Sequence, residues 1–218
     1  MKLLAGSALL AAMTLSIAAY AQTELQPFTG IKVFGKMEVS VKIGPEPSIK
    51  IDADPQRKEK ISYKIVKDKL HINNSITNNI VVIVSCPNIN YIELGGGAKL
   101  FNSGTINTDS LYIEAGAGTE LDLLVECDSI YSKIARKGFV RLTGKARALD
   151  LKTTTGGFLA AEDLENRILY ANMEDGTART KASEIIADIA PWSKIYYIGS
   201  PNIVRKDDSK GQIIPDEE

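Results

Sequence analysis

Two adjacent segments decide the fold: SLYIEAGAGTELDLLVECD, residues 110–128, and SIYSKIARKGFVRLTGKAR, residues 129–147. Placed one above the other, these 19-residue segments agree in chemistry at most positions. Three further segments of the same length continue the series over residues 148–166, 167–185 and 186–204. An earlier copy, YIELGGGAKLFNSGTINTD (91–109), fits with a slightly longer spacing, from Ile92 to Ile113 and from Leu100 to Leu121. The chain therefore contains an internal repeat with a period of about 19–21 residues.

Within each repeat, apolar residues alternate with polar ones, which indicates β-strands. A repeat this short cannot bury its own apolar side, so it must stack on its neighbours. The sequence thus predicts an all-β parallel β-helix, or solenoid, whose rungs of 19–21 residues lie about 4.8 Å apart. The aligned columns are Leu111, Ile130, Leu149, Ile168 and Ala187; Ile113, Leu151, Tyr170 and Ile189, interrupted by Ser132; Leu121, Val140, Leu159 and Ala178; and the glycines Gly138, Gly157 and Gly176.

Both ends of the predicted solenoid differ from its middle. Residues 28–90 contain short alternating strands broken by Gly44-Pro45, Asp54-Pro55 and Lys67-Asp68, as in hairpins or wider rungs. Because an open solenoid end exposes unpaired backbone groups, we expect this region to be an N-terminal cap. We expect IYYIGSPNIVRKDDSKGQIIP (195–215) to close the other end. The prediction is a single domain over 22–218, with a cap in 28–90 and regular rungs in 91–204.

The N-terminus has the features of a secretory signal peptide. Lys2 precedes the apolar run LLAGSALLAAMTLSIAA, and Ala19-Tyr20-Ala21 supplies small residues for cleavage. The run is short for a membrane span, which favours cleavage after Ala21 over an anchor. We therefore predict an exported protein of the periplasm, cell surface or medium, and no integral membrane segment.

Composition excludes several classes of function. The 218 residues carry a net charge of −1 with interspersed signs, which argues against a nucleic-acid partner. With one histidine and no CxxC motif, the sequence predicts no metal site, and it indicates no cofactor. A catalytic serine or cysteine normally needs a histidine as its base, and His71 is the only histidine. Because the sequence also has no GxSxG motif, we predict no catalytic residue.

The pair Gly156-Gly157 raises the question of a phosphate cradle. The nearest phosphate-loop match, Gly138 to Lys145, has one residue too many and is followed by Ala146 instead of Ser or Thr. Because Gly157 shares its column with Gly138 and Gly176, we interpret the pair as a backbone corner that requires glycine.

Two outward columns are candidates for ligand binding. Tyr112 and Tyr131 occupy equivalent positions, with Asp150 next, and exposed tyrosines can hold a sugar ring. Asp122 aligns with Arg141 and Arg179, beside a second column of Glu114, Lys133 and Lys152. Parallel β-helices also include pectinases and polysaccharide lyases, but a single carboxylate in the Asp122 column favours a surface ion ladder. The candidate ligand-binding residues are Tyr112, Tyr131, Asp150, Asp122 and Arg141.

Two cysteines in an exported chain favour a disulfide by their even number. Cys86 and Cys127 are separated by about two rungs, which places them about 10 Å apart in a shared column. This exceeds the roughly 7 Å that a disulfide tolerates between Cα atoms. We therefore predict two inward-pointing free thiols and no disulfide.

Several segments, taken in order, resemble the bacterial head GIN domain family. They are FTGIKVFGKMEVSVKIG (28–44), KLHINN (69–74), IVVIVSCPNINYIELGGGAKL (80–100) and YYIGSPNI (196–203). The sequence departs from the small-residue corners usual in that family at three segments: ARKGF (135–139), MEDGT (173–177) and PWSKI (191–195). The resemblance implies an exported β-helix-like protein of Bacteroidetes-type bacteria, with adhesion as an inferred role and no established activity.

Together these observations predict a secreted or cell-envelope module for binding or adhesion, with a surface glycan or polymer as its partner. The alternative is a carbohydrate-active enzyme of pectinase-like or lyase-like architecture. A purely structural envelope protein is a third class. The sequence makes no prediction of oligomeric state.

Overall fold

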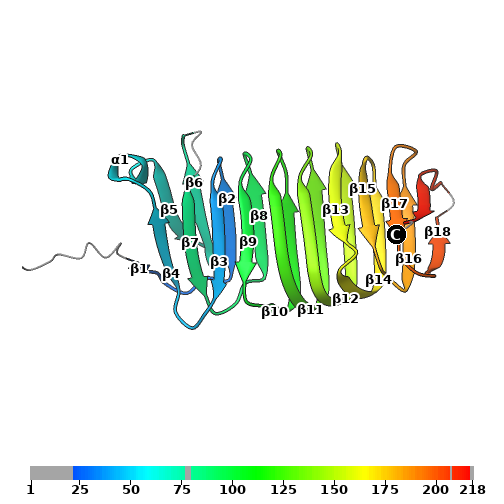
Figure 1. Ribbon diagram of the computed structural model, residues 1–218, viewed down its shortest axis with the longest axis horizontal. Helices are drawn as coiled ribbons and strands as arrows, with labels where there is room; N and C mark the ends of the chain where they lie inside the picture. The colour runs from blue at the N-terminus through cyan, green and yellow to red at the C-terminus, as the bar shows by residue number, and fades with distance from the viewer. Residues whose placement is uncertain (1–21, 77–79, 207, 217–218) are drawn as a thin grey trace, which may run out of the picture.

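The computed structural model describes residues 22–76, 80–206 and 208–216. The predicted signal peptide, residues 1–21, lies outside the described residues. The chain forms a β-solenoid of about seven turns with parallel stacked strands, as the sequence predicts. Figure 1 shows the rungs side by side along the long axis of the molecule. No helix in the described part of the chain is long and apolar enough to cross a membrane.

Each regular rung has two broad faces joined by a tight turn on one side and a short bent segment on the other (Figure 1). We call the first the tyrosine face. Its strands are β2 (Gly30–Phe34), β6 (Lys69–Asn74), β8 (Tyr91–Gly95), the C-terminal parts of β10 (Ile106–Ala115), β11 (Glu120–Ala135) and β12 (Phe139–Thr154), then β14 (Leu164–Met173), β16 (Glu184–Ile189) and β18 (Asn202–Arg205).

The opposite face contains the other strand of each rung. Its strands are β3 (Glu38–Ile43), β7 (Val81–Cys86), β9 (Lys99–Ser103), the N-terminal parts of β11 and β12, β13 (Gly157–Ala161), β15 (Gly176–Thr180), β17 (Lys194–Tyr197) and β19 (Gln212–Pro215). Inward side chains of the two faces form one continuous apolar core. Among the buried members of this core are Leu111, Ile113, Leu121, Ile130, Val140, Leu149, Leu151, Leu159 and Ala178.

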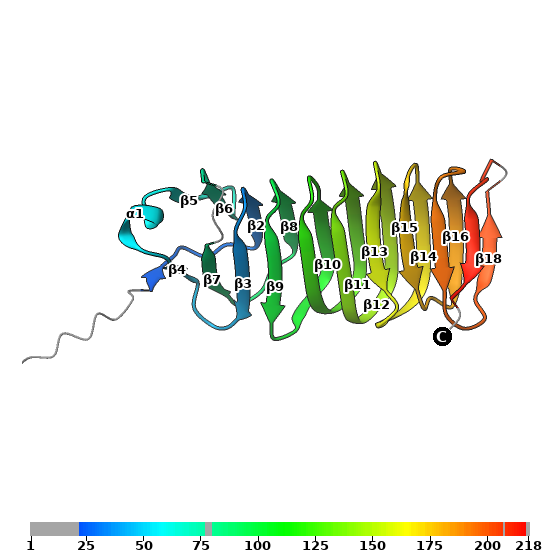
Figure 2. The ribbon, with the colours of Figure 1, turned by 45° about the horizontal axis from the view of Figure 1, so that its top comes forward.

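At the N-terminal end, spatial order departs from chain order (Figure 2). Strand β2 lies between β6 and β8, and β3 lies between β7 and β9, all in parallel register. The rung of residues 30–43 therefore lies between two rungs, β6–β7 and β8–β9, that both follow it in the sequence. Outside these rungs, the pairing becomes antiparallel. Strand β5 (Ile61–Val66) pairs with β6, β4 (Ser48–Asp52) with β7, and β1 (Thr23–Glu24) with β4.

One helical turn, α1 (Pro55–Lys58), connects β4 to β5. Asp54 caps it by accepting a hydrogen bond from the backbone N–H of Arg57 at 3.0 Å, and Pro55 occupies the first helical position.

The fixed 19-residue register holds on the opposite face from β13 to β15, where Leu159 pairs with Ala178, but it is wrong on the tyrosine face after residue 160. It is wrong again at β16, where Ala187 pairs with Ala171 and Ile189 with Met173, 16 residues apart. Arg141 pairs with Ala160, as that register requires, but Gly144 pairs with Leu164, one position further along than it predicts. The bend at Glu162-Asp163 therefore contains one extra residue. Because strand side chains alternate between faces, this shift exchanges inward and outward positions. Leu169 therefore replaces the predicted Ile168 beneath Leu149, and Tyr170 points outward, beside Asp150.

The glycine corner is confirmed as a structural feature, but the predicted reason holds only for one of its two residues. Gly156 has a φ of +76°, in the left-handed region that favours glycine. Gly157 has no such φ, and a Cβ there would instead lie 2.5 Å from the carbonyl oxygen of Ile134. Gly157 is required because the neighbouring rung leaves no space for a side chain.

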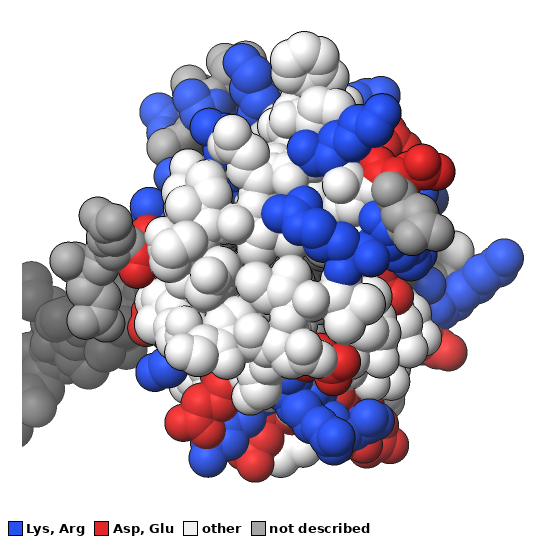
Figure 3. Space-filling view, turned by 90° about the vertical axis from the view of Figure 1, so that its right-hand side faces the viewer, with Lys and Arg blue, Asp and Glu red and all other residues white. Residues whose placement is uncertain are grey.

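The C-terminal segment forms a further rung, so parallel pairing extends past residue 204 to Pro215. Strand β18 pairs with β16, and β19 pairs with β17. A hydrogen bond of 2.8 Å from Arg205 Nη1 to the carbonyl oxygen of Gly211 fixes the connection between them. Ile203 and Val204 remain exposed on this last rung. Figure 3 shows this end of the molecule, where charged side chains lie mainly around an uncharged centre.

Candidate functional site

The tyrosine face carries a row of aromatic side chains at one outward position of successive rungs. Parallel pairing aligns Tyr91 with Tyr112, Tyr112 with Tyr131, Tyr131 with Asp150, and Asp150 with Tyr170. We call these five residues the tyrosine row. Their alignment follows from the parallel register, which places equivalent residues directly above one another.

Tyr112 and Tyr131 stack on each other. Their ring centroids lie 4.9 Å apart with an interplanar angle of 10°. The two residues are 48% and 42% exposed, so the pair stands on the surface of the sheet. Because each ring covers one face of the other, the remaining free face of Tyr131 is turned toward the rung of Asp150.

Tyr91, by contrast, is held in a network of charged groups. Its hydroxyl donates to Glu93 Oε2 at 2.8 Å and approaches Glu114 Oε1 at 3.3 Å. Lys69 Nζ lies 4.1 Å from the centroid of its ring, a cation–π contact. Burial and the two carboxylates raise the pKa of Tyr91 well above its usual range. This network fixes one end of the tyrosine row.

A second row runs beside the first, two residues further along each strand. Along the solenoid this charged row begins with an ammonium group, continues with two carboxylates and ends with two ammonium groups. Glu93 forms an ion pair with Lys32. Burial alone would raise the pKa of Glu93, but hydrogen bonds from Lys32 and Tyr91 lower it below its usual range. The charged row consists of Lys32, Glu93, Glu114, Lys133 and Lys152.

Two adjoining depressions follow these rows. The smaller, of about 190 Å³, lies between the tyrosine row and the charged row, over Ile113 and Ser132. The larger, of about 640 Å³, lies between the charged row and the tight turns, and we call it the trough. Glu114 and Lys133 line both. The two depressions therefore form one continuous surface.

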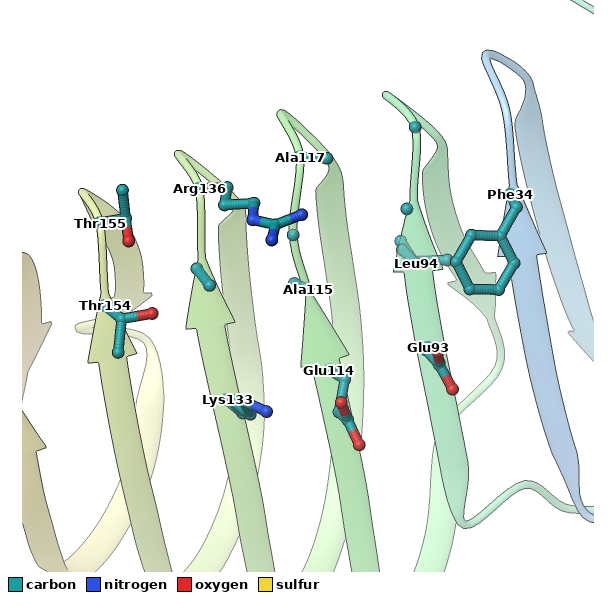
Figure 4. Close-up of a pocket in the computed structure, with 14 residues that line it drawn as sticks. Phe34, Glu93, Leu94, Glu114, Ala115, Ala117, Lys133, Arg136, Thr154 and Thr155 are labelled. Carbon is teal, nitrogen blue, oxygen red and sulfur yellow. The ribbon is translucent and has the colours of Figure 1, made fainter.

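Small residues shape the trough, including Gly95, Gly116 and Ala135. Phe34 bounds one end, and its ring lies so close to Gly95 that a Cβ there would be 2.7 Å from Cδ1. Figure 4 shows Glu93, Glu114 and Lys133 on successive rungs below the trough, with the Arg136 side chain directed toward Ala117. Thr154 and Thr155 line the trough at the far end.

The five candidate residues predicted from sequence lie on two different faces. Tyr112, Tyr131 and Asp150 lie together on the tyrosine face. Asp122 and Arg141 pair in adjacent strands of the opposite face, with Arg141 Nη1 at 3.7 Å from Asp122 Oδ2. Both members of this pair are about half exposed, so it is a surface ion pair separate from the tyrosine row.

Comparison with known families matches residues 27–201 to a family described as "Putative auto-transporter adhesin, head GIN domain". The chain belongs to the head GIN domain family. Comparison with curated protein sequences finds no match.

Solved structures share the fold of this head GIN domain at low sequence identity. A putative adhesin from Bacteroides fragilis NCTC 9343 has a TM-score of 0.79 at 18% identity, covering 89% of this chain and 95% of that one. A putative adhesin from Parabacteroides merdae ATCC 43184 has a TM-score of 0.67 at 16% identity, covering 90% and 95%. A putative lipid binding protein from Parabacteroides distasonis ATCC 8503 has a TM-score of 0.66 at 14% identity, covering 90% and 96%.

The two cysteines of the head GIN domain are free thiols in the structure. Cys86 ends β7 and is buried, while Cys127 lies in β11 and is partly buried against the core. Burial raises the pKa of each thiol to about 11, with Asp128 contributing at Cys127. That both stay reduced after export remains a prediction.

Sequence reasoning missed several residues of this surface. Tyr91 pairs directly with Tyr112 and could have been found from the repeat that begins at residue 91. The 19-residue pattern places Tyr170 in the inward column, because the extra residue at Glu162-Asp163 gives no periodic signal. The trough has no motif, since it arises where small residues of separate rungs come together with Phe34 from β2.

Proposed function

We propose that this head GIN domain is a cell-envelope or secreted binding module of the adhesin type, and that the tyrosine face binds a surface glycan or polymer. The family supports an adhesion-like role for an extracellular or envelope protein. The predicted signal peptide is consistent with export. The observation that carries the proposal is the exposed, stacked pair Tyr112–Tyr131 beside a continuous depression.

The chemistry of this surface suits a carbohydrate. Sugar rings have apolar C–H faces and a polar hydroxyl edge, so they are bound by aromatic rings with hydrogen-bonding groups nearby. Tyr112 and Tyr131 supply the aromatic surface, while Glu114, Lys133 and Asp150 line the same depression. The trough has the volume of a small-ligand site, of which typical examples measure about 300–1,000 Å³.

A carbohydrate-active enzyme is the alternative that the sequence left open, and the geometry gives it less support. On the opposite face, a depression of about 260 Å³ is lined by Glu38, Glu120 and Asp122. Two of these three carboxylates are paired with cations, Glu120 with Lys99 and Asp122 with Arg141. Glycoside hydrolysis generally uses two carboxyl groups facing the same bond. We therefore favour binding without turnover.

Glycan-array binding tests the proposal. We expect the wild-type protein to bind one or more glycans, and Tyr112→Ala and Tyr131→Ala to bind them more weakly while remaining folded by circular dichroism. Phe101→Ala is the matched control, because Phe101 is an exposed aromatic residue on the opposite face. Equal binding by all four proteins would contradict the assignment of the tyrosine face. Turnover of an acidic polysaccharide that is lost in Arg141→Ala would support the enzyme instead.

A further inference from the structure

We infer that Tyr131, Asp150 and Tyr170 form a slot for a single pyranose ring whose two faces are both apolar, as in glucose-configured sugars. This inference rests on the proposed function and assigns its sugar-binding position and sugar class. The three residues occupy one outward column on three consecutive rungs. We call them the slot.

The slot exists because an aspartate interrupts the aromatic column. Tyr131 and Tyr170 lie two rungs apart, which is about 10 Å at the usual strand spacing. Both side chains are exposed, at 42% and 43%. Between them lies the shorter side chain of Asp150, which lines the smaller depression together with Tyr131.

This spacing suits one sugar ring between two aromatic rings. Carbon atoms in contact lie about 4 Å apart, so a puckered ring contacting both tyrosines needs a gap close to the two-rung distance. Tyr131 already covers Tyr112 with its other face, and this stacking holds its ring across the solenoid axis. The free face of Tyr131 is thus presented to the slot.

The base of the slot is polar. Among the described residues, the Asp150 carboxylate has no hydrogen bond or ion pair. An ionised carboxylate is an acceptor only, which matches the hydroxyl donors on the edge of a sugar ring. Lys152 follows Asp150 by two positions in β12, and Asn172 follows Tyr170 by two positions in β14; both are exposed. A glycan chain that leaves the slot along the strand direction would pass over these two residues.

The double aromatic contact selects the configuration of the sugar. In a glucose-configured ring the hydroxyls are equatorial, so C–H groups cover both faces. An axial hydroxyl, as at position 4 of galactose, places a polar group on one face and would bury it against a tyrosine without a partner. The slot therefore favours glucose-configured over galactose-configured sugars.

Calorimetric titration with two tetrasaccharides tests the slot. We expect β-1,4-linked glucotetraose to bind the wild-type protein more tightly than β-1,4-linked galactotetraose. Tyr170→Ala and Tyr131→Ala should each raise the Kd for glucotetraose about tenfold. Asp150→Leu should also weaken binding, and Phe101→Ala on the opposite face should leave the Kd unchanged.

The outcomes separate the slot from the proposed function. Wild-type affinity in Tyr170→Ala, together with weakened binding in Tyr112→Ala, overturns the slot and leaves the tyrosine face as the binding surface. Equal affinity for the two tetrasaccharides, or preference for galactotetraose, also overturns the slot. Absence of binding to every glycan of the array overturns the proposed function and the slot with it.

Discussion

Gly157 and Gly176 occupy the same corner of neighbouring rungs, where the backbone of one rung lies directly against the next. A Cβ at Gly157 would lie 2.5 Å from the carbonyl oxygen of Ile134, and one at Gly176 would lie 2.4 Å from that of Gly157. Contacts of this kind cannot be relieved by rotating a side chain, because the backbone itself is the obstacle. The glycines at this corner therefore serve the stacking of rungs, which explains their presence without a bound phosphate.

Gly157→Ala should lower the free energy of unfolding by about 1–3 kcal/mol, since the neighbouring backbone must move to admit the methyl group. Gly116→Ala is the control, because its Cβ would find its nearest contact at 3.8 Å. Denaturant unfolding of both variants measures the difference. Equal stability of the two, or loss of glycan binding in Gly157→Ala with stability unchanged, would contradict this account.

His71 should make stability dependent on pH. Burial, with Lys32 and Lys64 next, lowers the pKa of His71 from its usual 6.5. Lys69 adds to this, and Glu93 opposes it. A group whose pKa is lowered in the folded state stabilises the protein above the unfolded pKa, and this contribution is lost as pH falls through the folded pKa.

Between about pH 8 and pH 5, the wild-type protein should therefore lose more unfolding free energy than His71→Gln. Denaturant unfolding at both pH values measures this difference. Because the chain has one histidine, its imidazole signal can be titrated directly by NMR. A midpoint at or above the usual value of 6.5 would contradict the assignment.

The cysteines provide a further test. Thiol titration of the denatured, unreduced protein should find two thiols per chain. A count of zero thiols would indicate a disulfide and contradict the prediction. In the native protein both thiols should react slowly near pH 8, because burial raises the pKa of each to about 11 and little thiolate is present.

At the scale of the strands, the repeat predicts the fold because in-register stacking demands the same residue class at the same position. This works from Leu111 through Ile130 to Leu149, where the observed pairing keeps the predicted period. It fails where Glu162-Asp163 adds one residue, since a bend tolerates an insertion that no periodic pattern reveals.

Thus the pair Tyr112–Tyr131 could be predicted from sequence, while Tyr170 could not. Nor could the trough, because Phe34 reaches it through the non-sequential insertion of β2 beside β8.

The Asp122–Arg141 ion pair tests whether the opposite face takes part in glycan binding. Since both side chains are about half exposed and 3.7 Å apart, the pair resembles other surface ion pairs, which contribute about 0–1 kcal/mol. Asp122→Asn should therefore change the unfolding free energy by less than about 1 kcal/mol and leave glycan binding unaltered. Loss of binding in this variant would move the site to the opposite face.

At the scale of the whole molecule, stacking of the rungs aligns equivalent residues into a surface that spans many rungs. The tyrosine row extends over rungs from Tyr91 to Tyr170, and the trough runs beside it from Phe34 to Thr155. Both features are therefore built from residues of several described rungs. Such extended surfaces are typical of repeat proteins that bind large partners, which fits the adhesin-like family of this chain.

The most direct test of the central claim is the mapping of backbone amide shifts in isotope-labelled residues 22–218 on addition of glucotetraose. The account predicts shifts concentrated on the tyrosine face, at Tyr112, Tyr131, Asp150 and Tyr170. Amides of the opposite face, such as those of Phe101, Asp122 and Arg141, should stay unchanged. Shifts confined to the opposite face, or no shift at the highest glucotetraose concentration used, would contradict it.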